Sequence, residues 1–383
     1  MIDNKITIAI CYDFDHTLTP FDMQEQGFLQ KCCKYKKDDF RNFWKRVQDL
    51  KKDEKMDQTT AYMYQMIKAA EKAGNLIQKE TLNSLGEKIT FFAGLDDWFD
   101  KINKIGEENN CKIKHYIISN GNYEIIEGSK IFDKFDRVYA STFHYNDNGN
   151  ADWPSTVINY TNKTQILFRI KKQVLDLYDD AVNNYVPSED IPIPFSNIVY
   201  IGDSDTDIPC MQIIKNYEGY SICVYEKNNE TRKQKAFKMF EEQRVNFYTE
   251  ADYSEGKELY KIVSDIIRKI AISNKLINKH LEQKRYIEEI KKEQHKYWDI
   301  INNFICTSSF ETTHSIVSKL NTEIINELNK EQLESIISAA ENISRIKWIM
   351  GENDVKQLYL VVKNKCSELG LTEYVSRIDK LLE

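Results

Sequence analysis

The sequence predicts an α/β protein with a mostly parallel sheet, a helical insertion and an all-helical C-terminal region. Up to about residue 272, short apolar runs alternate with segments of helical periodicity, as in a doubly wound sheet with helices on both faces. A group of helical segments interrupts this alternation directly after the first strand. From about residue 273 onward the strand-like runs stop. At 383 residues, the chain is long enough for two or three domains.

The first element is the start of the stretch 6–20, an apolar, β-branched run that predicts a buried strand and is followed by a turn ending at Pro20. The pattern then becomes helical. Asp57 is an acceptable N-cap and Gly74 a stop signal for one of these helices. We expect four helices in this insertion, at residues 22–34, 38–52, 57–74 and 78–89.

The alternating series resumes after the insertion. The predicted strands are residues 112–121, 137–145, 151–161, 197–202, 220–225 and 245–248, with a hairpin turn at 146–150. The predicted helices are residues 95–105, 123–128, 162–183, 208–215 and 257–272. Beyond residue 273 we expect a helical domain that begins from a charged helix around 284–296.

Composition narrows the class of protein. The formal net charge is −7, which gives no general reason to expect a nucleic acid or an anionic membrane as partner. No stretch approaches the roughly 20 apolar residues of a membrane span, and the first strand starts too early for a signal peptide. The eight cysteines show no CxxC motif or framework spacing, so we expect a reducing cytoplasm.

Carboxylates follow two of the predicted strands. Asp13 and Asp15 end the first strand, and because residues i and i+2 lie on the same side of a strand, they can face one point. Like charges so close need a cation or a proton between them, which predicts a metal site, an acid–base pair or both. Asp203 and Asp207 follow the strand at 197–202; alone they could be an Asx-turn residue and a helix N-cap.

In order, spacing and context, four pieces of the chain resemble the four motifs of haloacid-dehalogenase-like (HAD) hydrolases. They are Asp13-x-Asp15, Ser119, Lys163 and Gly202-Asp203-x-x-x-Asp207. That family consists mainly of Mg²⁺-dependent phosphatases. The insertion resembles the helical type-one cap of its phosphoserine-phosphatase-like branch. The resemblance covers residues 1–272 and implies a Rossmann-like three-layer α/β/α core at 1–20 and 91–272 and a cap at 21–90. The helical domain expected at 273–383 lies outside the resemblance.

The resemblance also implies roles for individual residues. Asp13 would be the nucleophile that forms an aspartyl-phosphate, and Asp15 the proton donor and acceptor. Ser119, with backbone N–H groups near Asn120, would hydrogen-bond the phosphoryl oxygens, and Lys163 would neutralise charge.

The implied metal is Mg²⁺, which prefers hard oxygen ligands. The carboxylates of Asp13 and Asp203 and the backbone carbonyl of Asp15 would hold it. Asp207 would orient metal-bound water or Lys163. Asp205, between the last two aspartates, is interpreted as a loop residue.

Other assignments remain open at this point. Lys171 or Lys172 could take the place of Lys163, which is preferred because it stands at the start of the helix at 162–183. His16 is interpreted as a variable loop position rather than a catalyst. The six histidines show no ligand spacing.

The predicted function is hydrolysis of a small phosphomonoester, because a cap inserted after the first motif generally covers the pocket. Residues 60–66, with Phe21 and Glu25, are the cap residues best placed to face the site, although each could equally pack within the cap. Phosphoserine is one candidate substrate. The alternative is an interaction or scaffold protein whose C-terminal helices form a homo-oligomer or bind a protein partner, with a regulatory or weakly active core.

Overall fold

The structure, a computed structural model, describes residues 5–383 apart from the side chains of residues 293 and 294. The chain forms two compact units, one up to Leu276 and the other from Ile277 to Glu383. None of the helices in residues 5–383 combines the length and apolar composition needed to cross a bilayer.

The first unit is built on one seven-stranded sheet in the order β4-β3-β2-β1-β5-β6-β7. Neighbouring strands pair in parallel except for the antiparallel hairpin of β3 and β4. This confirms the predicted mostly parallel sheet and its hairpin. The strands are β1 (Ile6–Tyr12), β2 (Cys111–Asn122), β3 (Arg137–Tyr145), β4 (Ala151–Thr156), β5 (Ile198–Gly202), β6 (Tyr220–Tyr225) and β7 (Phe247–Glu250).

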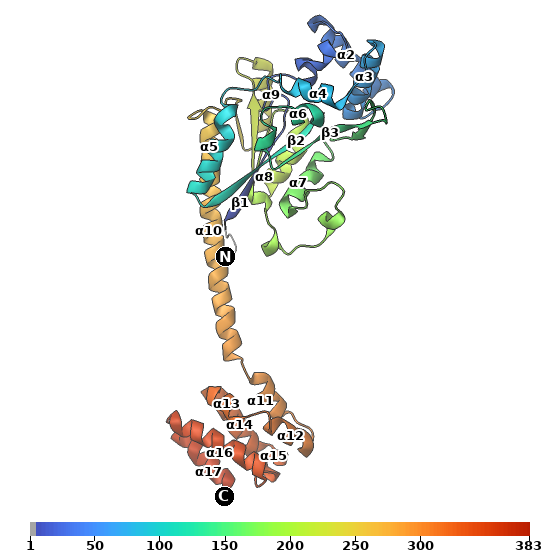
Figure 1. Cartoon of the computed structure of the whole chain (residues 1–383). Coiled ribbons are helices and arrows are strands. Elements are labelled where there is room, and N and C mark those ends of the chain that lie inside the picture. The colour runs from blue at the N-terminus through green and yellow to red at the C-terminus, as the bar shows by residue number, and fades with distance from the viewer. Residues whose placement is uncertain (1–4) are drawn as a thin grey trace. The chain divides into compact units, whose positions relative to one another are not determined.

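Helices cover both faces of this sheet (Figure 1). Alternate residues of β1 enter two separate apolar cores: Ile8 and Ile10 on one side, Ala9 and Cys11 on the other. The first core includes α5 (Leu95–Glu108) and the start of α10 (Glu258–Gln294); the second includes α7 (Lys163–Lys172), α8 (Ile208–Asn216) and α9 (Glu230–Glu241). The predicted three-layer α/β/α arrangement is therefore confirmed.

The insertion between β1 and α5 is helical, as predicted. It contains α1 (Phe28–Lys31), α2 (Phe40–Asp53), α3 (Gln58–Lys72) and α4 (Lys79–Gly86). Asp57 caps α3 by accepting hydrogen bonds from the N–H groups of Thr59 and Thr60 at 2.9 and 3.2 Å. The helix predicted at 22–34 is instead a 3₁₀ turn, Met23–Gln26, followed by the single turn of α1.

After the insertion, the helices differ from the prediction at three places. The helix predicted at 162–183 ends at Lys172, where Gln173 adopts a left-handed conformation with φ 56°. The buried guanidinium of Arg169 then donates to the carbonyls of three loop residues, Asp176, Leu177 and Asp179. These bonds hold the segment after Lys172 as a loop, although the spacing of its apolar residues is that of a helix.

The other two differences concern α9 and α10. Helix α9 lies in a polar stretch with little hydrophobic periodicity, and it was not predicted. Helix α10 continues without interruption past residue 272 to Gln294, because that stretch contains no Gly or Pro to end it. The short helix α6 (Tyr123–Glu127) agrees with its prediction.

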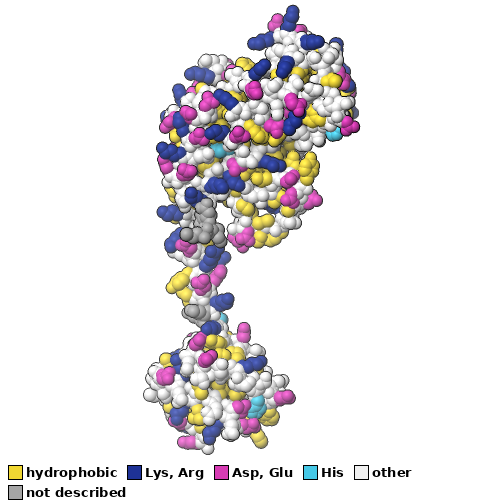
Figure 2. Space-filling view, in the orientation of Figure 1, with side chains coloured by type: hydrophobic (Ala, Val, Ile, Leu, Met, Phe, Trp, Pro, Cys, Tyr) yellow, Lys and Arg dark blue, Asp and Glu magenta, His cyan; other side chains and the backbone are white. Residues whose placement is uncertain are grey.

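The second unit is all helical beyond α10, as predicted, and has its own apolar core, which includes Ile301, Leu333, Tyr359 and Ile378. Its helices are α11 (Trp298–Ile305), α12 (Phe310–Val317), α13 (Thr322–Glu327), α14 (Lys330–Asn342), α15 (Ser344–Trp348), α16 (Asn353–Glu368) and α17 (Thr372–Leu382). Figure 2 shows charged side chains of both signs dispersed over the visible face of each unit.

Candidate active site

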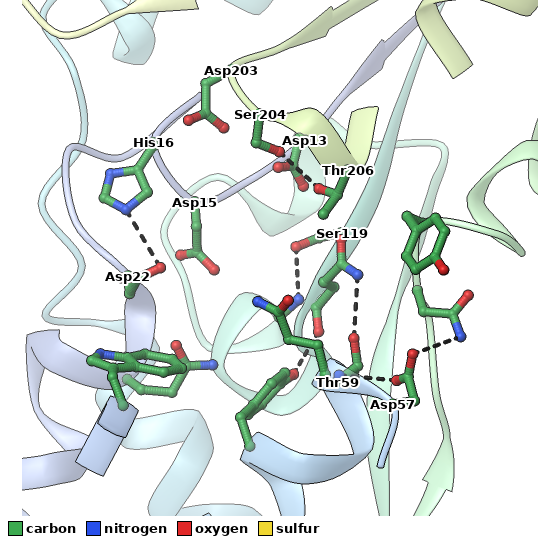
Figure 3. Close-up of a pocket in the computed structure, with 18 of the residues that line it drawn as sticks. Asp13, Asp15, His16, Asp22, Asp57, Thr59, Ser119, Asp203, Ser204 and Thr206 are labelled. Carbon is green, nitrogen blue, oxygen red and sulfur yellow. Dashed lines mark hydrogen bonds and ion pairs between the residues drawn. The ribbon is translucent and has the colours of Figure 1, made fainter. Parts of the chain in front are cut away.

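The candidate site lies where three adjacent parallel strands end. Strand β1 pairs with β2 on one side and β5 on the other, so their carboxyl ends share one edge of the sheet. Asp13 directly follows β1, and its backbone N–H donates to the carbonyl of Ile201 at 2.9 Å. Ser119 lies near the end of β2, and Asp203 follows β5. These three side chains converge in Figure 3.

Three buried carboxylates meet at this edge. Asp13, Asp203 and Asp207 each offer a carboxylate oxygen within 4.8 Å of the others. Asp207 ends the 3₁₀ turn Asp205–Asp207 and accepts hydrogen bonds from Ser204 Oγ at 2.9 Å and from the Tyr200 hydroxyl at 2.8 Å. The turn and the strand end thus hold the Asp207 carboxylate in one orientation.

Lys163 is the cation inside this group. Its Nζ donates to Asp13 Oδ1 at 3.0 Å and to Asp207 Oδ1 at 2.9 Å, and its side chain is fully buried. The alternative lysines point elsewhere: Lys171 lies over the Phe195 ring, and Lys172 donates to two loop carbonyls. Of these three lysines, Lys163 is therefore the one that contacts the carboxylates.

The carboxylates differ in charge state. Burial, reinforced by Asp207, raises the pKa of Asp13 to about 7, with Lys163 acting against this rise. Burial raises the pKa of Asp203 to about 6. Burial also opposes ionisation of Asp207, but Lys163 outweighs it and lowers the Asp207 pKa. Lys163 therefore favours the ionised form of Asp207, whereas burial favours the protonated forms of Asp13 and Asp203.

Asp15 lies outside the three-carboxylate group. Its Oδ1 accepts the backbone N–H of Met23 at 2.8 Å, at the start of the cap. Burial raises the pKa of Asp15 well above its ordinary value, and the nearby charge of Asp22 adds to this. A carboxyl in this state holds a proton that it can donate.

Ser119 and Asn120 have different surroundings. The Ser119 hydroxyl lines the cavity and accepts the Gly121 N–H at 3.0 Å. The Asn120 side-chain amide instead donates to Ile158 O at 3.0 Å and Thr59 Oγ1 at 3.3 Å. Its backbone carbonyl accepts the Tyr62 hydroxyl. The Asn120 side chain therefore connects the cap helix α3 to β2, whereas the sequence prediction for this position concerned the backbone N–H groups.

Gly121 leaves room for the side chains of Met23 and Asp15 at this strand end. A Cβ on Gly121 would lie 2.1 Å from the Met23 methyl and 3.1 Å from Asp15 Oδ2. Because glycine has no side chain, the end of β2 can lie against Met23 of the cap and the Asp15 carboxylate.

Sequence reasoning missed two basic residues of the site, both on α9. Arg232 Nη1 binds Asp203 Oδ2 at 2.7 Å, and Lys235 Nζ lies 3.2 Å from Asp205. Both line the same cavity as Asp13. The sequence offered one sign of this helix, namely Asn229, a residue type that favours the N-cap position. Its side chain caps α9 by accepting the Arg232 N–H at 3.2 Å.

His16 also lines the cavity, beside Asp15. Its Nε2 lies 3.4 Å from Asp22, and its Nδ1 is 2.9 Å from the Pro20 carbonyl. Burial opposes the protonated form, but the hydrogen bond and charge of Asp22 outweigh it and raise the His16 pKa to about 9. His16 is therefore an imidazolium that neutralises Asp22 and shapes the turn after β1.

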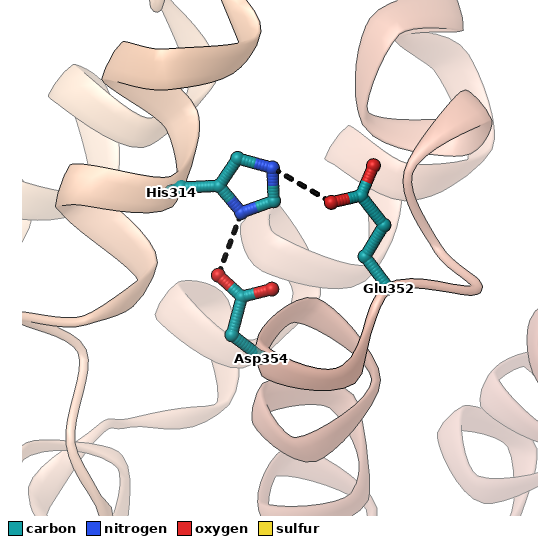
Figure 4. Close-up of side chains that lie close together, drawn as sticks. All are labelled: His314, Glu352 and Asp354. Carbon is teal, nitrogen blue, oxygen red and sulfur yellow. Dashed lines mark hydrogen bonds and ion pairs between the residues drawn. The ribbon is translucent and has the colours of Figure 1, made fainter.

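A second cluster of candidate ligands lies in the C-terminal unit (Figure 4). His314 on α12 places Nδ1 2.6 Å from Asp354 and Nε2 3.0 Å from Glu352. The two carboxylates face opposite ring nitrogens, so a single ion cannot use both nitrogens. The hydrogen bond with Asp354 raises the His314 pKa. This cluster is an ion-pair link between α12 and the start of α16.

Comparison with models of protein families gave no match. The chain is 29% identical over 294 residues to an uncharacterized protein of Borreliella burgdorferi, covering 70% of this chain and 99% of that one. Among solved structures it is similar to a HAD family hydrolase of Salmonella enterica serovar Typhi, with 15% identity, TM-score 0.44 and coverage of 67% and 73% of the two chains. It is also similar to a phospho-aspartyl intermediate analogue of phosphoserine phosphatase, with 16% identity, TM-score 0.42 and coverage of 68% and 98%.

Proposed function

We propose that this protein is a Mg²⁺-dependent phosphatase of the HAD type that hydrolyses a small phosphomonoester through an aspartyl-phosphate intermediate. The observation that carries the proposal is the meeting of Asp13, Lys163, Asp203 and Asp207 at the carboxyl edge of the sheet. Asp15 stands beside this group with a raised pKa. Few other reactions need a buried nucleophilic carboxylate, a proton donor and a cation site together.

The donor set fits a small hard cation. Asp13 and Asp203 offer buried carboxylate oxygens, and burial together with the nearby charge of Asp207 raises the pKa of both. These two carboxylates would hold Mg²⁺, together with the backbone carbonyl of Asp15 as the motif resemblance implies. When bound, Mg²⁺ would neutralise charge on the phosphoryl group and align it with Asp13.

The chain's own groups account for both chemical steps. An ionised Asp13 oxygen attacks phosphorus, the bond from phosphorus to the ester oxygen breaks, and Asp15 gives its proton to that oxygen. Asp15 then accepts a proton from the attacking water, whose oxygen displaces Asp13 and releases inorganic phosphate. Ser119 and Lys163 hold the phosphoryl oxygens and stabilise their charge during both steps.

A phosphatase assay tests the proposal directly. We expect the protein to hydrolyse para-nitrophenyl phosphate with Mg²⁺ present, and to lose this activity when EDTA removes the metal. Restoring Mg²⁺ in excess should restore the rate. If neither this ester nor a panel of small phosphomonoesters is hydrolysed with Mg²⁺ present, the proposed function is wrong.

Mg²⁺ affinity should fall as the pH drops below about 7, because protons and metal compete for Asp13 and Asp203. Each proton displaced costs up to about tenfold in affinity per pH unit. Isothermal titration calorimetry at about pH 5.5 and about pH 8 measures this difference. An affinity that does not change between these two pH values would contradict the assignment of these carboxylates as ligands.

The same pKa values set the sign of the stability change. A carboxyl whose pKa is raised by folding binds its proton more tightly in the folded state, so its contribution is present at low pH and lost as the pH rises through the folded value. The metal-free protein should therefore lose stability between about pH 4 and about pH 7 through these groups, and Mg²⁺ should offset this loss.

We also propose that residues 1–20 and 91–272 form the catalytic core, that residues 21–90 form the cap, and that residues 273–383 form a separate domain. All eight cysteines are unpaired and seven of them are buried. We accordingly propose a reducing compartment such as the cytoplasm.

A further inference from the structure

The cavity beside Asp13 has a volume of about 390 Å³, which suits a small molecule. Its floor is the edge of the sheet, with Asp13 and Ser119. The cap contributes Trp44 of α2, Tyr62 of α3 and Asp57 at the N-terminus of α3. In Figure 3, Asp57 lies at the opposite end of the drawn site from Asp203. A substrate with its phosphate at Asp13 therefore directs its alcohol portion toward these cap residues.

The walls of this cavity are acidic. Five carboxylates line it, namely Asp13, Asp15, Asp22, Asp57 and Asp203. Its three cationic side chains are already paired: Arg232 with Asp203, Lys235 with Asp205 and His16 with Asp22.

The cap side of the cavity has no compensating cation. Among the described residues that line the cavity, those of the cap include no Lys or Arg. A second anionic group on the substrate would therefore lie near Asp57 with no basic partner, and burying an unpaired charge is costly.

The cap side also presents aromatic surface. The rings of Trp44 and Tyr62 lie with centroids 6.4 Å apart at 61°. Their polar atoms are occupied, because Trp44 Nε1 donates to Glu25 Oε1 at 2.7 Å and the Tyr62 hydroxyl donates to the Asn120 carbonyl. What these two side chains offer to a ligand is ring surface, which attracts cations.

We propose that the substrate is the phosphomonoester of a cationic alcohol, a small amino or quaternary-ammonium alcohol with no second anionic group. This inference rests on the proposed function. The aromatic rings stabilise the positive charge, while the phosphate occupies the Asp13 end. The Asp57 carboxylate, which also accepts N–H groups of Thr59, Thr60 and Asn159, adds negative charge beside the rings. O-phosphoserine fits less well, because its carboxylate finds no cation on the cap side.

Matched esters test this inference. Phosphocholine and 3,3-dimethylbutyl phosphate have nearly the same shape, but only the first carries a positive charge. We expect kcat/KM to be about tenfold higher for phosphocholine or phosphoethanolamine than for the neutral ester, and higher than for O-phosphoserine by at least as much. Equal values for charged and neutral esters, or a preference for O-phosphoserine, would overturn the inference.

A variant tests the role of the aromatic surface. Trp44→Leu should reduce the ratio of kcat/KM between phosphocholine and the neutral ester to near one, a readout that does not depend on how much protein is folded. Trp153→Leu is the control, because Trp153 is 62% exposed on β4 and does not line the cavity. A ratio unchanged in Trp44→Leu would show that the ring does not recognise the cation.

Binding separates this inference from the proposed function. With Asp13→Asn and Mg²⁺, calorimetry should show at least about tenfold tighter binding of phosphocholine than of 3,3-dimethylbutyl phosphate. If no ester is hydrolysed by the native protein but this preference remains, the proposed function fails, and only the recognition of a cationic phosphomonoester by the cavity is upheld. If para-nitrophenyl phosphate is hydrolysed but binding shows no preference, the inference alone fails.

Discussion

Replacing Asp13 with asparagine should reduce phosphatase activity by at least about a thousandfold, the scale on which enzymes lose rate when a nucleophile is removed. The amide cannot attack phosphorus, yet it has nearly the same shape and keeps an oxygen for the metal. The fold should persist, because the substitution removes a buried charge whose pKa is already raised. Single-turnover assays with para-nitrophenyl phosphate measure the loss.

Asp205→Asn is the matched control for this experiment. Asp205 lies in the turn between the two aspartates of the last motif, and its carboxylate pairs with the partly exposed Lys235. The same chemical change should leave kcat within about twofold, since a surface ion pair contributes little. Activity that survives Asp13→Asn undiminished would refute the covalent mechanism while leaving hydrolysis by another route.

Lys163→Met should destabilise the metal-free protein by about 3–5 kcal/mol, the cost of removing one partner from a buried ion pair. Methionine fills much of the lysine volume, but it leaves Asp13 and Asp207 facing each other without the shared cation. Hydrogen exchange of β1 amides reports this loss, because β1 is central in the sheet of the first unit. Saturating Mg²⁺ should restore part of the stability.

Two controls separate the loss of the ion pair from the effect of replacing a lysine with methionine. Lys171→Met alters a lysine on the same helix whose Nζ lies 4.6 Å from the Phe195 ring centre. It should cost under about 1 kcal/mol. Adding Asp13→Asn to Lys163→Met should recover stability, because it removes one of the two unpaired charges. If the two lysine variants are equally stable, Lys163 does not carry the electrostatic role assigned to it.

Sequence patterns predicted the central part of the site because its residues follow strands. A buried apolar run that ends in Asp13-x-Asp15, and another that ends at Gly202-Asp203, must place their carboxylates at one edge of a parallel sheet. Arg232 could not be predicted in this way. It reaches Asp203 from a polar helix without an apolar stripe, so neither periodicity nor a strand end marks it.

The fold was predictable where local patterns and tertiary packing agree. The β-branched runs of the sheet are buried on both faces, so their composition alone identifies them. Predictions failed where a single tertiary contact overrides local periodicity. The segment after Lys172 has helical spacing, yet the carbonyls bound by Arg169 turn it into a loop. Nothing in a sequence window indicates that this arginine is buried.

The double attachment of α3 to the end of β2 has a consequence for turnover. Asn120 binds Thr59 through its side chain and Tyr62 through its carbonyl, one position after Ser119. Any opening of the cap at α3 must break both bonds, and doing so frees the backbone that orients the Ser119 hydroxyl. In the proposed phosphatase, the same opening of the cap would admit a new substrate and release the bound phosphate, so its rate would set an upper limit on kcat.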